Sequence, residues 1–315
     1  MLLSIMSTVF LISCTASQTT SLLVTMIVTN GKPDSFTNYS NPIAPSATWD
    51  ECVDYCFNMA SCIAVYDKNC EMYEGGQIDT AIRVQGERIA FKILVDNSTA
   101  AERCPSDDSG TKTGHYYTNT TYRSYTVTYS NPTWTFNYSP VLRCPTNFTL
   151  FTRPLGLWCM RVFNHYACCN RTIASFMCAT HSSQLSGVEN REEFDFIHEN
   201  SIPILANISE PVNGTKYAVI GVWVDANRTQ ACWQQTTSPC NTIKAFSFED
   251  PTLSASPTGY IWIDSNQPNG LESPADGIVF RMNSNTSYGM DDTRSGRAVD
   301  GSACWKGYVC GVAPT

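Results

Sequence analysis

The sequence predicts an α+β protein built from two disulfide-rich domains that follow a secretion signal. After Cys14, fourteen cysteines remain in two groups, five between residues 52 and 104 and nine between residues 144 and 310. In both groups, segments with helical periodicity alternate with short, strand-like apolar segments. A chain of 315 residues also has room for about two domains.

The amino-acid composition indicates a folded protein and excludes some kinds of binding partner. Hydrophobic residues make up 43% of the chain and charged residues 15%, a balance that favours folded cores over disorder. The net charge of −8 and the pI near 5.0 argue against nucleic acids and anionic membranes, because both bind basic patches. Fifteen cysteines indicate an oxidising compartment.

Residues 1–16 are predicted to be a secretory signal peptide. Their apolar core ends at Ile12, and Cys14-Thr15-Ala16 supplies small residues for cleavage before Ser17. The apolar run is too short for a membrane anchor, which needs about 18 residues. Leu11-Ile12-Ser13-Cys14 also resembles a bacterial lipoprotein cleavage box. However, the Asn-x-Ser/Thr glycosylation signals in the rest of the chain favour a eukaryotic secretory route.

Ten Asn-x-Ser/Thr sequons predict a secreted, extracellular glycoprotein without a transmembrane segment. Each glycosylated asparagine must lie on the surface. The ten positions are Asn38, Asn97, Asn119, Asn137, Asn147, Asn170, Asn207, Asn213, Asn227 and Asn285.

Domain boundaries are expected to follow the two cysteine groups. We expect a first domain over residues 22–103, a Ser/Thr/Tyr-rich linker over 104–142 and a second domain over 143–315. Residues 105–120 have the composition of a linker, whereas residues 122–138 are rich in Thr, Tyr and Trp and predict one or two strands.

The first domain is predicted to hold one helix that starts after Thr48. Thr48 and Glu51 form a capping box. One helical face then carries Trp49, Cys52, Val53, Cys56, Phe57 and Ala60, and strand-like segments lie on either side of the helix.

The spacing Cys52-x3-Cys56-x5-Cys62-x7-Cys70, with a closing strand at 90–93, resembles the short form of the PAN/apple module. This resemblance implies the disulfides Cys52–Cys70 and Cys56–Cys62, and a domain that binds protein or carbohydrate. A small core needs such bonds, each of which contributes about 2–4 kcal/mol. A purely structural spacer is the alternative.

Seven segments of the second domain follow one another in a characteristic order. They are Cys144-Pro145 to Trp158-Cys159, a helical stretch ending at Cys178, 184–193, Ile220-Gly221-Val222-Trp223, 246–250, Gly259-Tyr260-Ile261-Trp262 and Gly307-Tyr308-Val309-Cys310-Gly311. In this order they resemble a long-form C-type lectin-like domain. Within them, Asn190 and Glu193 predict a second capping box, with Phe194 and Ile197 on the buried face.

The same resemblance implies two disulfides in this domain, Cys144–Cys159 and Cys178–Cys310. Cys232 and Cys240 bracket a short insert and are expected to pair with each other. Gly277 stands where the family usually has another cysteine, whose partner is missing or displaced to Cys304. The sequence therefore leaves Cys104, Cys168, Cys169 and Cys304 unassigned.

Sugar-binding members of this family hold a calcium ion in a long loop, and calcium takes six to eight oxygen ligands. Here Gln267-Pro268-Asn269 has the matching pattern, with Pro268 as the expected cis proline. On the next strand, Met290-Asp291-Asp292 stands where the family has Trp-Asn-Asp, and Glu272 or Asp276 is the candidate for a further ligand.

The resemblance thus implies a calcium site and a sugar site that share residues. The candidate calcium ligands are Gln267, Asn269, Glu272, Asp276, Asp291 and Asp292. The candidate sugar contacts are Gln267, Asn269 and Asp291. Tyr260 and Trp262 are expected in the core. The implied function is carbohydrate or glycoprotein binding in extracellular recognition or host defence. The alternative is a secreted adhesive molecule that contacts other proteins without an active sugar site.

The sequence also contains features of two other chemistries, zinc binding and catalysis. His165, Cys168, Cys169, Cys178 and His181 have zinc-like spacing, but an oxidising compartment disfavours free thiolates. An enzyme is not expected, because no nucleophile elbow or phosphate loop occurs, and His115 and His198-Glu199 stand without partner motifs.

Overall fold

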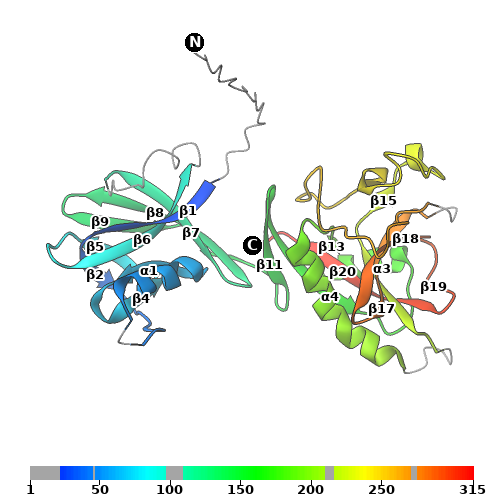
Figure 1. Ribbon diagram of the computed structural model, residues 1–315, viewed down its shortest axis with the longest axis horizontal. Coiled ribbons are helices and arrows are strands. Elements are labelled where there is room, and N and C mark those ends of the chain that lie inside the picture. Colours follow the sequence, from blue (N-terminus) through cyan, green and yellow to red (C-terminus); the bar gives the residue numbers. More distant parts are fainter. Residues whose placement is uncertain (1–21, 45–46, 97–108, 210–215, 271–274) are drawn as a thin grey trace, which may run out of the picture. The chain divides into compact units, whose positions relative to one another are not determined.

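The computed structural model describes residues 22–44, 47–96, 109–209, 216–270 and 275–315. Cys104, Glu272, Asn97, Asn213 and the predicted signal peptide lie outside these ranges. The chain divides into two compact units (Figure 1): one reaches Tyr116 and includes Arg123–Pro140, and the other comprises Tyr117–Tyr122 and Val141–Thr315. Both mix helices with strands, as the sequence predicts.

Among its described residues, the first unit is an antiparallel sheet with one α-helix, α1 (Trp49–Asn58), against it. The strand order is β2-β5-β9-β8-β7-β6-β3-β4, and β1 also pairs with β6. The bounds are β1 (Leu22–Asn30), β2 (Lys32–Phe36), β3 (Cys62–Tyr66), the 3-10 turn η1 (Lys68–Cys70), β4 (Glu71–Glu74), β5 (Ile78–Ile82), β6 (Arg88–Asp96), β7 (Thr111–Tyr117), β8 (Thr121–Ser130) and β9 (Thr133–Tyr138).

The helix α1 begins as the sequence predicts. The Thr48 N–H donates to Glu51 Oε2 at 2.7 Å, and the Glu51 N–H donates to Thr48 Oγ1 at 3.4 Å. Cys52 and Cys56 are buried on the inner face, which packs beside Val65 of β3.

The predicted linker over 104–142 is mostly sheet, which corrects the expectation for residues 105–120. Strand β7 occupies residues 111–117, and β8 and β9 follow it in the same sheet. Gly114 lies so close to the Tyr125 ring that a Cβ at this position would come within 2.4 Å of it. The Ser/Thr/Tyr composition suits strands that are polar on one face and bury Tyr125 and Trp134 on the other.

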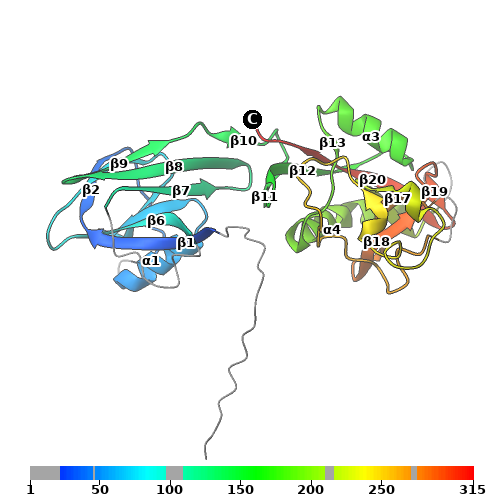
Figure 2. The same cartoon turned by 90° about the horizontal axis from the view of Figure 1, so that it is seen from above.

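The second unit contains a sheet in the order β11-β12-β20-β14-β17-β18, in which β14 and β20 run parallel. Helices α3 and α4 cover opposite faces of it (Figure 2). The bounds are β10 (Leu142–Arg143), β11 (Thr149–Arg153), β12 (Gly156–Asn164), α3 (Arg171–Thr180), β13 (Gln184–Leu185), α4 (Arg191–Ala206), η2 (Asn207–Ser209), β14 (Val219–Val224), β15 (Asn227–Arg228), η3 (Gln230–Cys232), η4 (Ile243–Ala245), β16 (Phe246–Ser247), β17 (Gly277–Ser284), β18 (Ser287–Thr293), β19 (Val299–Asp300) and β20 (Ala303–Val312).

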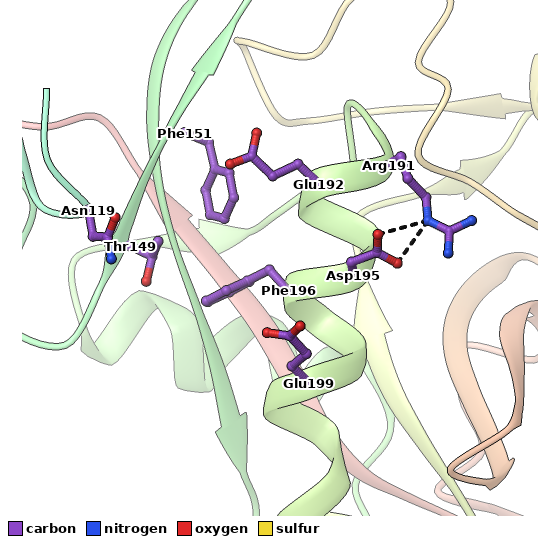
Figure 3. A pocket seen from close by; sticks show the side chains of 8 residues that line it. All are labelled: Asn119, Thr149, Phe151, Arg191, Glu192, Asp195, Phe196 and Glu199. Atoms are coloured by element: carbon purple, nitrogen blue, oxygen red, sulfur yellow. Dashed lines mark hydrogen bonds and ion pairs between the residues drawn. The ribbon is translucent and has the colours of Figure 1, made fainter. Parts of the chain in front are cut away.

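The start of α4 only half matches the predicted capping box. Asn190 accepts from the Glu193 N–H at 3.0 Å. The Glu193 carboxylate does not accept from the N–H of the capping residue Asn190. It is fully buried, forms two hydrogen bonds of 2.7 and 2.9 Å with Arg153 of β11, and accepts from the Glu189 N–H at 2.7 Å. On the exposed side of the helix, Arg191 pairs with Asp195 at 2.8 Å (Figure 3). The acidic residue expected at the cap therefore belongs to the interior.

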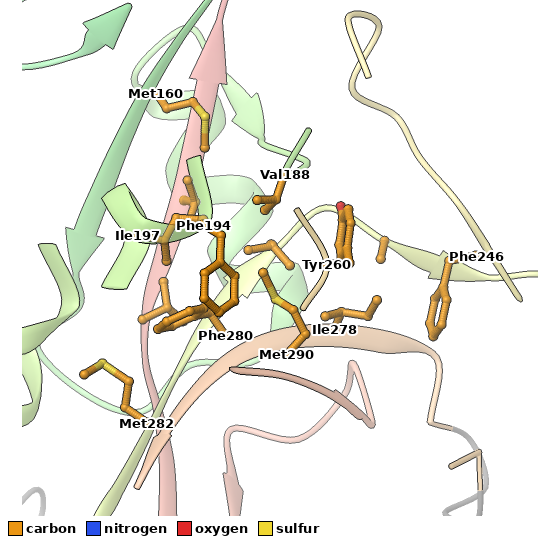
Figure 4. Close-up of a cluster of buried hydrophobic side chains, with 14 of the residues drawn as sticks. Met160, Val188, Phe194, Ile197, Phe246, Tyr260, Ile278, Phe280, Met282 and Met290 are labelled. Atoms are coloured by element: carbon orange, nitrogen blue, oxygen red, sulfur yellow. The ribbon is translucent and has the colours of Figure 1, made fainter. Parts of the chain in front are cut away.

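The core between α4 and the sheet contains Phe194 and Ile197, as predicted, packed with Phe280 and other apolar side chains (Figure 4). Tyr260 is in this core, where its hydroxyl donates to the Asp225 carbonyl at 2.5 Å. Trp262 is half-buried at the edge of the cluster.

The described residues form six disulfides. They are Cys52–Cys70, Cys56–Cys62, Cys144–Cys159, Cys178–Cys310, Cys232–Cys240 and Cys168–Cys304. The first five are the pairs predicted from the sequence, and the sixth joins two cysteines that the sequence left unassigned. The disulfides at Cys168 and Cys178 rule out the zinc alternative, because they remove the thiolates it requires. Cys169 is buried and forms no disulfide with the other described cysteines.

Candidate functional site

The candidate site lies where the chain between β14 and β17 meets the end of β18. The Gln267–Pro268 peptide is cis, as predicted, and Pro268 is buried. The backbone N–H groups of Asn269 and Gly270 donate to the carboxylate of Asp292 at 2.9 and 3.0 Å. Asn269 and Asp292, both predicted for the site, are therefore brought together, but through the backbone of the loop.

Arg228 completes this arrangement, and sequence reasoning missed it. Its guanidinium donates to Asp292 Oδ2 at 2.6 Å and to the Ala275 carbonyl at 2.7 Å. The Arg228 and Asp292 side chains are 2% and 0% exposed, and the guanidinium also lies 4.6 Å from the centre of the Phe246 ring. A positive charge is thus buried directly against Asp292.

The other predicted carboxylates have separate partners. Asp291 pairs with Arg281 at 2.7 Å, on the opposite side of the strand from Asp292, as neighbouring strand residues must be. Burial raises the pKa of Asp291, and Arg281 opposes that shift. Asp276 accepts from the Ser295 backbone and hydroxyl, both at 2.7 Å.

These contacts do not fit a calcium ion. Calcium needs several oxygen ligands directed at one point. Here Asp291, Asp292 and Asp276 are directed to Arg281, Arg228 and Ser295 respectively. Within the described ranges, no three His, Cys, Asp or Glu side chains come together as a metal-binding group. A cation bound to Asp292 would also be repelled by the buried guanidinium of Arg228.

A pocket of about 520 Å³ lies beside the cis proline. Gln267 and Asn269 line it, and the Asn269 N–H donates to Gln267 Oε1 at 3.2 Å. The remaining lining residues are Thr236, Asn241, Ser265, Asn266 and Pro268. All its polar side chains are amides or hydroxyls, which both donate and accept hydrogen bonds without a formal charge. Sequence reasoning found two of these side chains and missed four, because residues 236–266 contain no motif that points to them.

The sequon asparagines occupy different environments. Asn38, Asn119, Asn137, Asn147, Asn207 and Asn285 are exposed. Asn170 and Asn227 are half-buried: Asn170 caps α3, and the Asn227 amide donates to Glu249 at 3.1 Å. In the part of the chain that the structure describes, no helix combines the length and apolarity needed to cross a membrane.

Comparisons with known families agree with the two domains. A family model for a PAN-like domain matches residues 26–93, and one for C-type lectin domain-containing protein 141/158 matches residues 140–276. Both resemblances predicted from the sequence are thereby confirmed. A comparison with curated proteins gives no match.

The solved structures that this chain matches include the cow C-type carbohydrate-recognition domain of CD23, determined in the presence of a GlcNAc2Man3 oligosaccharide. It is 13% identical, with a TM-score of 0.34, over 55% of this chain and 98% of that one. Herring type II antifreeze protein is 15% identical, with a TM-score of 0.34, over 54% and 98%. The mouse scavenger receptor C-type lectin carbohydrate-recognition domain is 14% identical, with a TM-score of 0.32, over 55% and 98%.

Proposed function

Because this chain joins a PAN-like domain to a C-type lectin-like domain, we propose that it is a secreted protein that binds carbohydrate independently of calcium. The observation that carries the proposal is the 520 Å³ pocket lined by neutral amides and hydroxyls beside Pro268. Its volume is typical of small-molecule sites. Sugar hydroxyls donate and accept hydrogen bonds, so amides such as Asn266 and Gln267 suit them as partners.

Arg228 supports the calcium-free part of this proposal. In a calcium-dependent site the ion holds the loop to the strand and supplies positive charge. Here Arg228 supplies that charge next to Asp292, and its bond to the Ala275 carbonyl ties the far end of the loop to the same point. The loop is therefore held in place by the protein's own residues.

In this proposal the protein acts outside the cell. The six disulfides suit an oxidising compartment, and the exposed sequons suit a glycoprotein. In this proposal the second domain recognises glycans or glycoproteins, and the PAN-like domain contributes a separate contact with protein or carbohydrate. We assign no catalytic role to either domain.

The test is glycan binding by the secreted protein in calcium and in excess chelator. A glycan array is followed by titration of each hit against Gln267→Ala and Asn266→Ala. Asn200→Ala, which changes an exposed amide on α4 away from the pocket, serves as the matched control. We expect equal binding in both buffers, at least tenfold weaker binding for the pocket variants (about 1.4 kcal/mol), and no change for the control.

Other outcomes separate the alternatives. Binding that disappears in chelator would contradict the role given to Arg228 but would leave a carbohydrate-binding domain. Binding unaffected by both pocket variants would place the sugar elsewhere. No binding to any glycan would favour the adhesive alternative, in which the lectin-like domain serves protein contacts.

A further inference from the structure

A second pocket, of about 550 Å³, is lined by residues of α4, of β11 and of the turn between β7 and β8 (Figure 3). Phe151 and Phe196 form its apolar part, with their rings edge-to-face and 5.2 Å between centroids. Glu192 and Glu199 of α4 are exposed at its rim. An apolar floor with a few polar groups is typical of a ligand site.

Asn119, the asparagine of a sequon, lies at the edge of this pocket. The backbone fixes it there: its carbonyl accepts from the Leu150 N–H of β11 at 2.7 Å, and the next carbonyl, of Thr120, accepts from the Cys144 N–H at 2.8 Å. Figure 3 shows Asn119 and Thr149 facing Phe196 and Glu199 across the pocket. A sugar attached to Asn119 would begin at the mouth of a cavity of suitable size.

We propose that an N-linked glycan on Asn119 occupies this pocket. In the linkage, Asn119 Nδ2 bonds to C1 of the first N-acetylglucosamine, losing a proton, while the lipid diphosphate that carried the sugar leaves. The apolar face of the sugar packs on Phe196 and Phe151. Its hydroxyls donate to the carboxylates of Glu192 and Glu199, for which the described residues provide no hydrogen-bond partner.

The covalent tether makes such a contact effective even when the free sugar binds weakly. A ligand on a short tether is present at a local concentration in the millimolar range. Both carboxylate oxygens of Asp195 already accept from Arg191, at 2.8 and 2.9 Å. Asp195 therefore lines the pocket but does not accept from the sugar hydroxyls. The inference does not depend on the site beside Pro268 and goes beyond the function proposed for it.

The experiment compares two glycans within one molecule. The protein is secreted from eukaryotic cells, and glycopeptide mass spectrometry follows native enzymatic deglycosylation at Asn119 and at Asn285, an exposed asparagine in the turn between β17 and β18. If the Asn119 glycan is out of the pocket about a tenth of the time, its release is about tenfold slower. After denaturation the two rates should agree.

A conservative variant tests the pocket itself. Phe196→Leu keeps apolar contact with Phe151 but removes the flat face on which a sugar packs, so the rate at Asn119 should approach that at Asn285. Glu199→Gln, which keeps the shape of the side chain, should accelerate release by a smaller factor. An unglycosylated Asn119 in the secreted protein would overturn the proposal. So would equal native rates at the two sites, or a slow rate that Phe196→Leu leaves unchanged.

Discussion

Replacing Arg228 by glutamine is the sharpest test of whether Arg228 takes the place of a calcium ion beside Asp292. The substitution removes the 2.6 Å bond to Asp292 and leaves a carboxylate whose side chain is 0% exposed. Breaking a buried ion pair in this way costs about 3–5 kcal/mol. Asp292 keeps the N–H donors of Asn269 and Gly270, so we expect the lower end, about 3 kcal/mol.

The assay is denaturant and thermal unfolding of the secreted protein. For a domain of this size, about 3 kcal/mol corresponds to a Tm lowered by about 6–12 °C. Arg191→Gln is the control, because its pair with Asp195 is 64% and 42% exposed and is worth less than about 1 kcal/mol. A loss below about 1 kcal/mol for Arg228→Gln would refute the reasoning. So would a wild-type Tm that rises with millimolar calcium, since an ion that binds only the folded state stabilises it.

Three further predictions concern the interior of the second unit. Arg153→Met leaves the buried carboxylates of Glu193 and Asp250 without their shared cation and should cost about 3–5 kcal/mol in denaturant unfolding, whereas replacing an exposed arginine should cost little. Removing Cys178–Cys310 leaves Cys168–Cys304 in place, so it opens only the ring of about 16 residues between these two bonds and should cost about 3 kcal/mol, whereas removing both bonds also opens the 136-residue loop and should cost about 8 kcal/mol; equal losses for the single and the double removal in calorimetry would contradict the chain-entropy account. Burial raises the pKa of the Cys169 thiol from 9.0 to about 12, so the thiolate is scarce at pH 8 and iodoacetamide should label Cys169 only after denaturation; rapid labelling of the native protein would show that the thiol is accessible.

Local signals predicted much of the fold. The cysteine spacing in the first domain, the cap at Thr48 and the apolar face of α4 each depend on residues a few positions apart, and the structure contains them all. The cis Gln267–Pro268 bond was predicted through a family pattern of only three residues.

Features that depend on distant partners could not be predicted in this way. Arg228 and Asp292 are 64 residues apart, and Arg228 lies in a sequon that suggests glycosylation instead of an ion pair. Glu193 has the position of a capping residue, but Arg153, 40 residues earlier, draws it inward. The composition of residues 105–120 predicts a linker instead of strand β7, because the burial of this strand depends on Tyr125 of the next strand, which lies over Gly114.

The two long disulfides have a consequence for how this protein would survive among extracellular proteases. Cys168–Cys304 and Cys178–Cys310 both connect the region around α3 to β20, and both enclose the loop formed by residues 179–303. A single cut in that loop therefore releases no fragment. The two pieces stay joined by both disulfides, and their strands remain paired in one sheet. Such a nicked molecule would migrate as intact protein until it is reduced, and it would keep its fold after damage that would divide an unbridged domain.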